Sequence, residues 1–141
     1  MPEIKNHNVY VSSFAYCKNF NTSQNVNENE SNVTLIPFLN INSLHHGAAL
    51  YAVCSIVGIH SFDNDSIYVY FKAPDDSILL QYDWTLDSRL LNNIGGKIPD
   101  AIVFNIAISC NIQDTGFYST EVFFNNLRIG NFKINVISRD I

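Results

Sequence analysis

Residues 48–86 decide the fold. They read AALYAVCSIVGIH, the turn SFDND, the segment SIYVYFKA, the turn PDD, and the segment SILLQYDWTL. The three apolar segments are short, rich in β-branched and aromatic residues, and bounded by Asp, Asn, Ser and Pro. We therefore predict three consecutive β-strands here, forming a meander to which the remaining strands are added.

The second and third of these segments alternate strictly between two kinds of side chain. A two-residue turn drawn from residues 74–76 would pair odd positions of one strand with even positions of the other. This register separates a core-facing set from a polar and aromatic set. The core-facing set is Ile67, Val69, Phe71, Ile78, Leu80, Tyr82 and Trp84, and the opposite set is Tyr68, Tyr70, Lys72, Gln81 and Asp83.

The other segments complete a small β protein. The segment 50–60 is apolar on both faces, so we expect a central strand covered on both sides. Between strands we expect a polar loop at 18–31 and a sheet-to-sheet crossover at 87–100, with one helical turn at 88–92. Further strands are predicted at 8–17, at 32–41 with a bend or edge at Pro37, at 101–111, and at 116–124 and 127–137, the last two joined across Asn125 and Asn126.

About eight short strands with regular turn signals indicate one β-sandwich domain over residues 1–141. The fold class that we predict is all-β, a two-sheet antiparallel sandwich that is immunoglobulin-like or jelly-roll-like. The chain is 47% hydrophobic and 15% charged. Such a composition is typical of a folded protein with a large core.

Charge excludes some partners. The formal net charge is −5, and the eight basic residues are scattered along the sequence. Without a basic stripe we expect neither nucleic-acid binding nor attraction to an anionic membrane. The N-terminus MPEIKNHNVYV lacks the pattern of a signal peptide, and no apolar run reaches the ~18 residues that span a bilayer. We therefore expect a cytoplasmic protein.

Two resemblances add to this interpretation. Asp114, Gly116 and Tyr118 form a D-x-G-x-Y pattern, which resembles the tyrosine corner of immunoglobulin-like sandwiches. The Cys…Trp…Cys spacing of true immunoglobulin domains is absent. More broadly, the segments VYVSSFAYC, VTLIPF, YAVCSIVGI, IYVYFKAPDDSIL and GFYSTEVFFNNLRIGNFKINV resemble an uncharacterised family of small β-sandwich proteins of bacteria and phages. The chain departs from that family at Asp76, where Gly is usual, and in its Asn-rich insert.

Metal and catalytic sites find little support in the sequence. Asp63, Asp65 and Asp87 should meet at one end of the sheet and could hold Ca²⁺, although Asp is also common in solvated turns, which is the interpretation we favour. No zinc-binding spacing joins the histidines and cysteines: His45, His46, His60, Cys17, Cys54 and Cys110. G-x-S-x-G is also absent, as is a glycine-rich phosphate loop. We therefore expect neither a cofactor nor an enzymatic activity.

The opposite set around Tyr68 and Tyr70 is the candidate binding face, because tyrosine offers a large contact area with a polar tip. The competing interpretation is that the 18–31 loop or the crossover covers this face. We predict a protein-interaction module that also associates with itself, an accessory protein of a phage or mobile element. The alternative is a sandwich that binds a small sugar or lipid through Trp84 or the loops at the strand ends.

Overall fold

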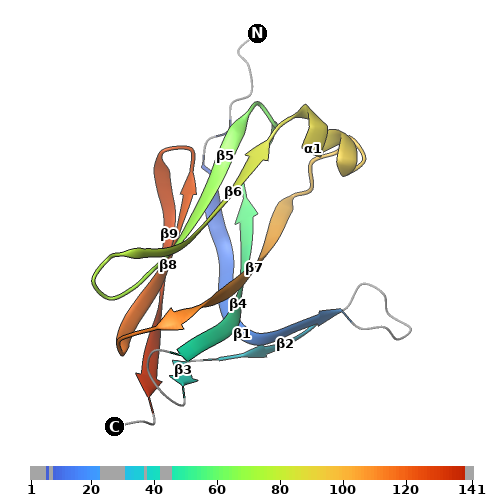
Figure 1. The fold of residues 1–141 in the computed structure, drawn as a ribbon. Helices are drawn as coiled ribbons and strands as arrows, with labels where there is room; N and C mark the ends of the chain where they lie inside the picture. Colours follow the sequence, from blue (N-terminus) through green and yellow to red (C-terminus); the bar gives the residue numbers. More distant parts are fainter. Residues whose placement is uncertain (1–5, 7, 23–30, 37, 42–45, 139–141) are drawn as a thin grey trace.

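The computed structural model describes residues 6, 8–22, 31–36, 38–41 and 46–138. They form two packed β-sheets and one short helix (Figure 1). The four-stranded sheet has the order β2-β1-β4-β7, and the five-stranded sheet has the order β3-β9-β8-β5-β6. The elements are β1 (Tyr10–Thr22), β2 (Ser31–Leu35), β3 (Phe38–Ile41), β4 (His46–Val57), β5 (Asp65–Lys72), β6 (Ile78–Leu86), α1 (Ser88–Asn93), β7 (Ala101–Ile112), β8 (Gly116–Phe124) and β9 (Leu127–Ser138). The predicted all-β sandwich is confirmed.

The core lies between the sheets and is built by alternation along each strand. Ile67, Val69 and Phe71 of β5 are at most 2% exposed, so the predicted core-facing set of this strand is confirmed. They pair with Trp84, Tyr82 and Leu80 of β6 in the register that the alternation predicts. Inward-facing residues of β1, β4, β6, β7, β8 and β9 belong to the same core cluster.

Ile78 is predicted in the core by the alternation and is instead 53% exposed. The pairing of β5 with β6 shifts by one residue between Phe71 and Lys72, so Ile78 lies opposite Lys72. A β-bulge of this kind inserts one extra residue and reverses the faces beyond it.

The prediction that the strands of residues 48–86 form one meander is wrong, because β4 belongs to a different sheet from β5 and β6. It pairs with β1 and β7, whereas β5 pairs with β6 and β8. The chain changes sheets after β4 through Gly58, whose φ is +94° and whose missing Cβ would lie 2.4 Å from the Asn8 carbonyl oxygen. Only glycine fits such a left-handed turn against neighbouring backbone. β4 is central in its sheet as predicted, but its outward-facing Tyr51 and Val53 are half-exposed rather than covered.

The predicted strand 32–41 is two strands in different sheets. β2 pairs with β1, and β3 pairs in parallel with β9. The sandwich is therefore not wholly antiparallel. The predicted bend at Pro37 falls outside the described residues. The predicted loop 18–31 also starts too early, since β1 continues to Thr22, and residues 23–30 lie outside the described part.

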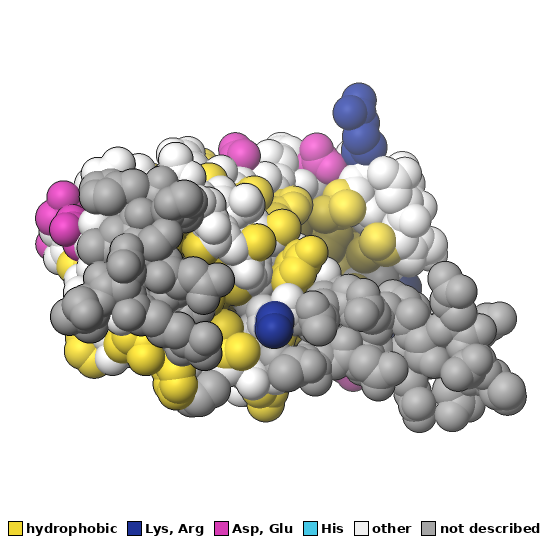
Figure 2. Space-filling view, turned by 60° about the horizontal axis from the view of Figure 1, so that its bottom comes forward, with side chains coloured by type: hydrophobic (Ala, Val, Ile, Leu, Met, Phe, Trp, Pro, Cys, Tyr) yellow, Lys and Arg dark blue, Asp and Glu magenta, His cyan; other side chains and the backbone are white. Residues whose placement is uncertain are grey.

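The crossover and the final hairpin follow the predictions. α1 begins after Asp87, whose side chain caps the helix by accepting a hydrogen bond from the Leu90 N–H. The turn between β8 and β9 contains Asn125 with a φ of 53°, a left-handed angle that asparagine tolerates. On the side of the molecule shown in Figure 2, hydrophobic side chains gather centrally and acidic ones lie toward the periphery. Among the described residues, no helix is long and apolar enough to cross a membrane.

Candidate functional site

The candidate face is the outward surface of the five-stranded sheet, which we call the tyrosine face. Strand pairing places Tyr68 opposite Asp83 and Tyr70 opposite Gln81, with Lys72 next along β5. The five predicted residues therefore share one surface. The tyrosine face consists of Tyr68, Tyr70, Lys72, Gln81, Asp83, Phe117, Ser119, Glu121, Phe123, Arg128, Asn131 and Lys133.

Strand β8 contributes residues that the sequence interpretation did not include. Phe123 lies opposite Tyr68, and Glu121 lies opposite Tyr70. The signal was present in the sequence, because Ser119, Glu121 and Phe123 alternate with the buried Tyr118, Thr120 and Val122. What the sequence did not show is that β8 is the neighbour of β5.

Three aromatic rings form one half of the tyrosine face. The rings of Tyr68 and Tyr70 are parallel, with centroids 6.5 Å apart and an interplanar angle of 1°. Phe123 meets Tyr70 edge-on at 5.5 Å and 72°. Both tyrosines are half-exposed, so packed rings are presented to the outside while their positions are fixed by neighbours.

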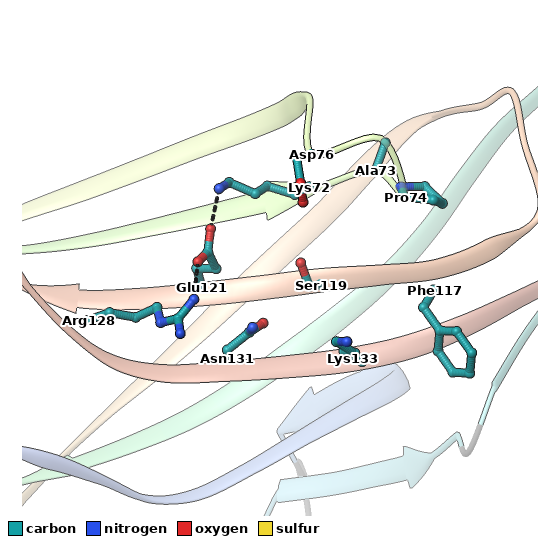
Figure 3. A pocket seen from close by; sticks show the side chains of 10 residues that line it. All are labelled: Lys72, Ala73, Pro74, Asp76, Phe117, Ser119, Glu121, Arg128, Asn131 and Lys133. Atoms are coloured by element: carbon teal, nitrogen blue, oxygen red, sulfur yellow. Dashed lines mark hydrogen bonds and ion pairs between the residues drawn. The ribbon is translucent and has the colours of Figure 1, made fainter.

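A buried carboxylate with two cations forms the other half. Glu121 is only 6% exposed, and its two oxygens form ion pairs with Lys72 Nζ and with Arg128, the latter at 2.9 Å (Figure 3). The hydrogen bond from Lys72 and, to a smaller extent, that from Arg128 lower the pKa of Glu121 despite the opposing effect of burial. The carboxylate is therefore held ionised, and it fixes both cations in place.

A groove of about 580 Å³ adjoins these ion pairs. Figure 3 shows its side chains along β8 and β9, with Pro74 and Asp76 at the β5–β6 turn. Among its described lining residues, Lys72, Arg128 and Lys133 are cationic, and Glu121 and Asp76 are anionic. The groove is thus slightly positive on a chain whose net charge is −5. Strand pairing brings Lys72 of β5 together with Arg128 and Lys133 of β9, which follow it much later in the sequence.

Two segments could cover the tyrosine face, and the helix of one of them, the 87–100 crossover, lies elsewhere. The crossover helix α1 packs against β6 and not over the tyrosines, and Leu90 contacts the core there. The other covering segment, the predicted loop 18–31, lies largely outside the described residues. The functional role of Tyr68, Tyr70, Lys72, Gln81 and Asp83 stays a prediction.

Two of the three acidic residues considered as calcium ligands have other partners. Asp65 accepts hydrogen bonds from Asn6 at 2.8 Å and from Asn125 at 3.0 Å, one on each oxygen. Asp87 caps α1, and Asp63 is exposed. Within the described ranges, no group of three His, Cys, Asp or Glu side chains is placed to hold a metal ion.

The cysteines are protected from reaction by burial. Cys17 and Cys54 are buried and Cys110 is half-buried, all as free thiols. Burial raises the pKa of Cys54 to about 12 and raises that of the other two. Their thiolate population at neutral pH is correspondingly small, which suits packing and not nucleophilic chemistry. Of the histidines considered with them, His60 is exposed and His45 lies outside the described residues.

Two buried hydroxyl contacts define the class of sandwich. Tyr118 donates a hydrogen bond to the Asp114 carbonyl oxygen at 2.7 Å, which closes the tyrosine corner indicated by D-x-G-x-Y. Thr120 stands two residues after Tyr118, where an immunoglobulin domain has its second cysteine. Thr120 is fully buried and hydrogen-bonds the Tyr16 hydroxyl at 2.7 Å, while Tyr16 also donates to the Phe132 carbonyl at 2.6 Å. This polar contact joins β1 to β8 and so links the two sheets from the position on β8 where those domains carry one end of their disulfide.

The strand order agrees with this class. In immunoglobulin folds, strands A, B and E share one sheet, and strands C, F and G share the other. Here β1, β4 and β7 occupy one sheet, and β5, β8 and β9 the other, with β6 extending the second sheet. The fold is therefore an immunoglobulin-like β-sandwich.

Comparisons with known proteins found solved structures that resemble the chain at TM-scores below 0.5. No protein-family model and no curated protein matches the chain. An immunoglobulin-like protein from Pseudomonas aeruginosa is 12% identical with a TM-score of 0.47, over 94% of this chain and 98% of that one. A CARDB domain from Pyrococcus furiosus, crystallised with di-metal ions, is 9% identical with a TM-score of 0.42, over 97% and 100%. An alkylpurine DNA glycosylase of Pseudomonas fluorescens, bound to DNA, is 8% identical with a TM-score of 0.42, over 91% of this chain and 30% of that one.

Proposed function

We propose that this protein is a non-enzymatic protein-binding module whose contact surface is the tyrosine face. The observation that carries the proposal is the packing of Tyr70 between Tyr68 and Phe123, beside a carboxylate held by two cations. Aromatic residues and arginine are enriched at protein interfaces. Here they are held together on one sheet surface.

The rigidity of the tyrosine face favours binding. Ordering a flexible side chain at an interface costs about 0.5–1.5 kcal/mol. Tyr68 and Tyr70 already stack on each other, and Arg128 is already held by Glu121. Less entropy is lost when a partner docks on side chains that have few alternatives left.

Charge indicates the chemistry of the partner. Arg128 has a side chain 53% exposed, and the exposed Lys133 lies on the same strand beside the groove. A partner segment with an acidic side chain next to an apolar one would meet both halves of the face. Our proposal also includes a cytoplasmic location and an accessory role in a phage or other mobile element. The support for the accessory role is the resemblance in sequence to small β-sandwich proteins of bacteria and phages.

The test compares variants in a quantitative pull-down from the host lysate. Tyr68→Ala and Tyr70→Ala remove the aromatic half, and Asn92→Ala, exposed on α1, is the control outside both proposed contact surfaces. We expect proteins retained by the wild type and by Asn92→Ala to be lost at least tenfold from both tyrosine variants. Equal recovery by all variants, with unchanged circular dichroism, would reject the tyrosine face as the contact surface.

We also propose that the protein associates with itself through the four-stranded sheet. Strands β4 and β7 contain no Asp, Glu, Lys or Arg, and Val103 of β7 is 60% exposed. Two copies with a net charge of −5 each repel one another, and this repulsion is weakest when the surfaces that face each other carry no charge. β7 is moreover a 12-residue edge strand without the charges or prolines that protect edges from pairing.

A further inference from the structure

A second site, separate from the tyrosine face, lies where the two sheets part at their edges. β6 is the edge of the five-stranded sheet, and β7 is the edge of the four-stranded sheet. Figure 1 shows α1 crossing from one to the other at this end of the sandwich. The space between them is a pocket of about 310 Å³, at the lower limit for small-molecule sites.

The walls of the pocket are apolar and come from four segments. Trp84 of β6 and Phe104 of β7 face each other with ring centroids 4.8 Å apart and planes at 48°. Leu90 and Ile94 close the pocket from the crossover, and Phe62 lines it from the segment before β5. Tyr82 donates a hydrogen bond to the Ala107 carbonyl oxygen and so ties β6 to β7 farther along the two strands.

Several apolar side chains that line the pocket remain exposed to solvent in the folded protein. Ile94 is 43% exposed and Val103 is 60% exposed, although both line the pocket. Trp84 and Phe104 are only partly buried, while residues farther along β7, such as Ile106 and Ile108, are at most 2% exposed. An apolar ligand that covered these side chains would gain the free energy of removing them from water.

Size and charge specify the ligand. At about 30 Å³ for each water-sized group, the pocket holds roughly ten methylene-sized groups. Among the described residues that line it, Lys97 alone is charged, and it is exposed near the end of α1. A cation beside an apolar pocket favours a ligand with an apolar body and an anionic head.

We infer that the pocket between β6, β7 and α1 binds a medium-chain carboxylate, with the alkyl chain against Trp84 and Phe104 and the carboxylate paired with Lys97. This inference does not depend on the tyrosine face, since the pocket lies on another part of the molecule, and it shares only Val103 with the surface proposed for self-association. The sequence analysis offered a sugar or a lipid as an alternative ligand at Trp84, and the pocket favours the acyl chain of a lipid.

Trp84 is the sole tryptophan of the chain, so its fluorescence reports on this pocket directly. Purified protein is titrated with sodium hexanoate, octanoate and decanoate below their micellar concentrations. We expect a saturable change in emission, with an affinity that rises about fourfold for each additional CH₂ group that the pocket removes from water. Far-ultraviolet circular dichroism checks that the fold is unchanged by the ligand.

Three variants assign the site. Lys97→Met should weaken decanoate binding at least fivefold, and Ile94→Asp, which adds a carboxylate at an exposed position of the rim, at least tenfold. Lys133→Met on the tyrosine face should leave the affinity unchanged. Absence of a saturable change with decanoate, or equal affinity in Ile94→Asp, would overturn the site. Unchanged affinity in Lys97→Met would overturn the assignment of the carboxylate to that lysine.

Discussion

The two sheets turn similar apolar faces toward each other and very different faces outward. The outward side of the five-stranded sheet carries Tyr70, which packs against Phe123, and Glu121, which forms an ion pair with Arg128. The outward side of the four-stranded sheet carries residues such as Val53 of β4 and Asn105 of β7, on strands without a charged side chain. The inward faces make the fold, and they leave the outward faces free to differ.

The difference teaches how charge is placed in a chain that has little of it. Only 15% of the residues are charged, yet the pairing of β5, β8 and β9 brings Lys72, Glu121 and Arg128 into direct contact. A buried carboxylate requires compensation, because an ionised group away from water is unfavourable unless it is paired. The charged side of the sandwich therefore has a structural function as well as a proposed binding function.

The largest expected effect concerns this buried carboxylate. Glu121→Leu leaves Lys72 and Arg128 without their anion, so we expect the free energy of unfolding to fall by about 1–3 kcal/mol. The lower part of that range reflects the partial exposure of both cations. The matched change Asn105→Leu, at an exposed site of β7, should stay within about 0.5 kcal/mol. Urea denaturation measures both, and equal losses would remove the distinction between the two outward faces.

The contact that joins the two sheets gives the next effect. Tyr16→Phe removes the hydroxyl that bridges Thr120 and the Phe132 carbonyl, leaving buried polar groups without this partner. We expect a loss of about 1–2 kcal/mol in unfolding free energy. Tyr10 lies on the same strand and is 55% exposed, so Tyr10→Phe is the control and should change stability little. A Tyr16→Phe protein as stable as the Tyr10→Phe protein would show that this bridge contributes nothing.

The pH dependence of stability sharpens the comparison further. The lowered pKa of Glu121 means that the folded chain binds this proton less tightly than the unfolded chain does. The resulting stabilisation is fully present above the unfolded pKa of about 4.3, and it is lost as the pH falls through the lower folded pKa. The difference in unfolding free energy between wild type and Glu121→Gln should therefore shrink between pH 6 and pH 2. A difference independent of pH would assign the effect to packing.

Self-association provides the smallest expected effect and tests the outward surface of β4 and β7. Val53 is half-exposed on the outward side of β4, and Val53→Lys introduces a charge there. We expect the dimer dissociation constant to rise about tenfold, a change of about 1.4 kcal/mol. Gln81→Lys adds the same charge to the tyrosine face and should leave the constant unchanged. Sedimentation velocity over a range of concentrations measures both, and a monomeric wild type at every concentration would contradict the proposal.

Local patterns were sufficient wherever neighbours in sequence are also neighbours in space. The register of β5 with β6, the capped turn of helix at α1 and the hairpin at Asn125 depend on a few adjacent residues, and each was predicted. The tyrosine corner at Tyr118 likewise lies within five residues of chain. Alternation with period two and turn chemistry determine such features directly.

Failures occurred where the chain chooses between sheets. Nothing in the alternation of β4 shows that Gly58 leads to the opposite sheet, or that β3 pairs in parallel with a strand almost a hundred residues later. The position of Ile78 depended on a bulge that shifts the pairing without any change in composition. In the same way, Tyr68 and Tyr70 could be assigned to one face, but their contact with Phe123 and Glu121 required the position of β8.

The sequence by itself determined that apolar and polar side chains lie on opposite sides of extended strands, because successive side chains of a strand point in opposite directions. The tertiary structure alone decided which strands became neighbours. Strand pairing depends on how the complete apolar faces of the strands pack together, and no short segment of sequence specifies this. For that reason the tyrosines were visible in the sequence, while the carboxylate with its two cations and the pocket at Trp84 were visible only in the folded chain.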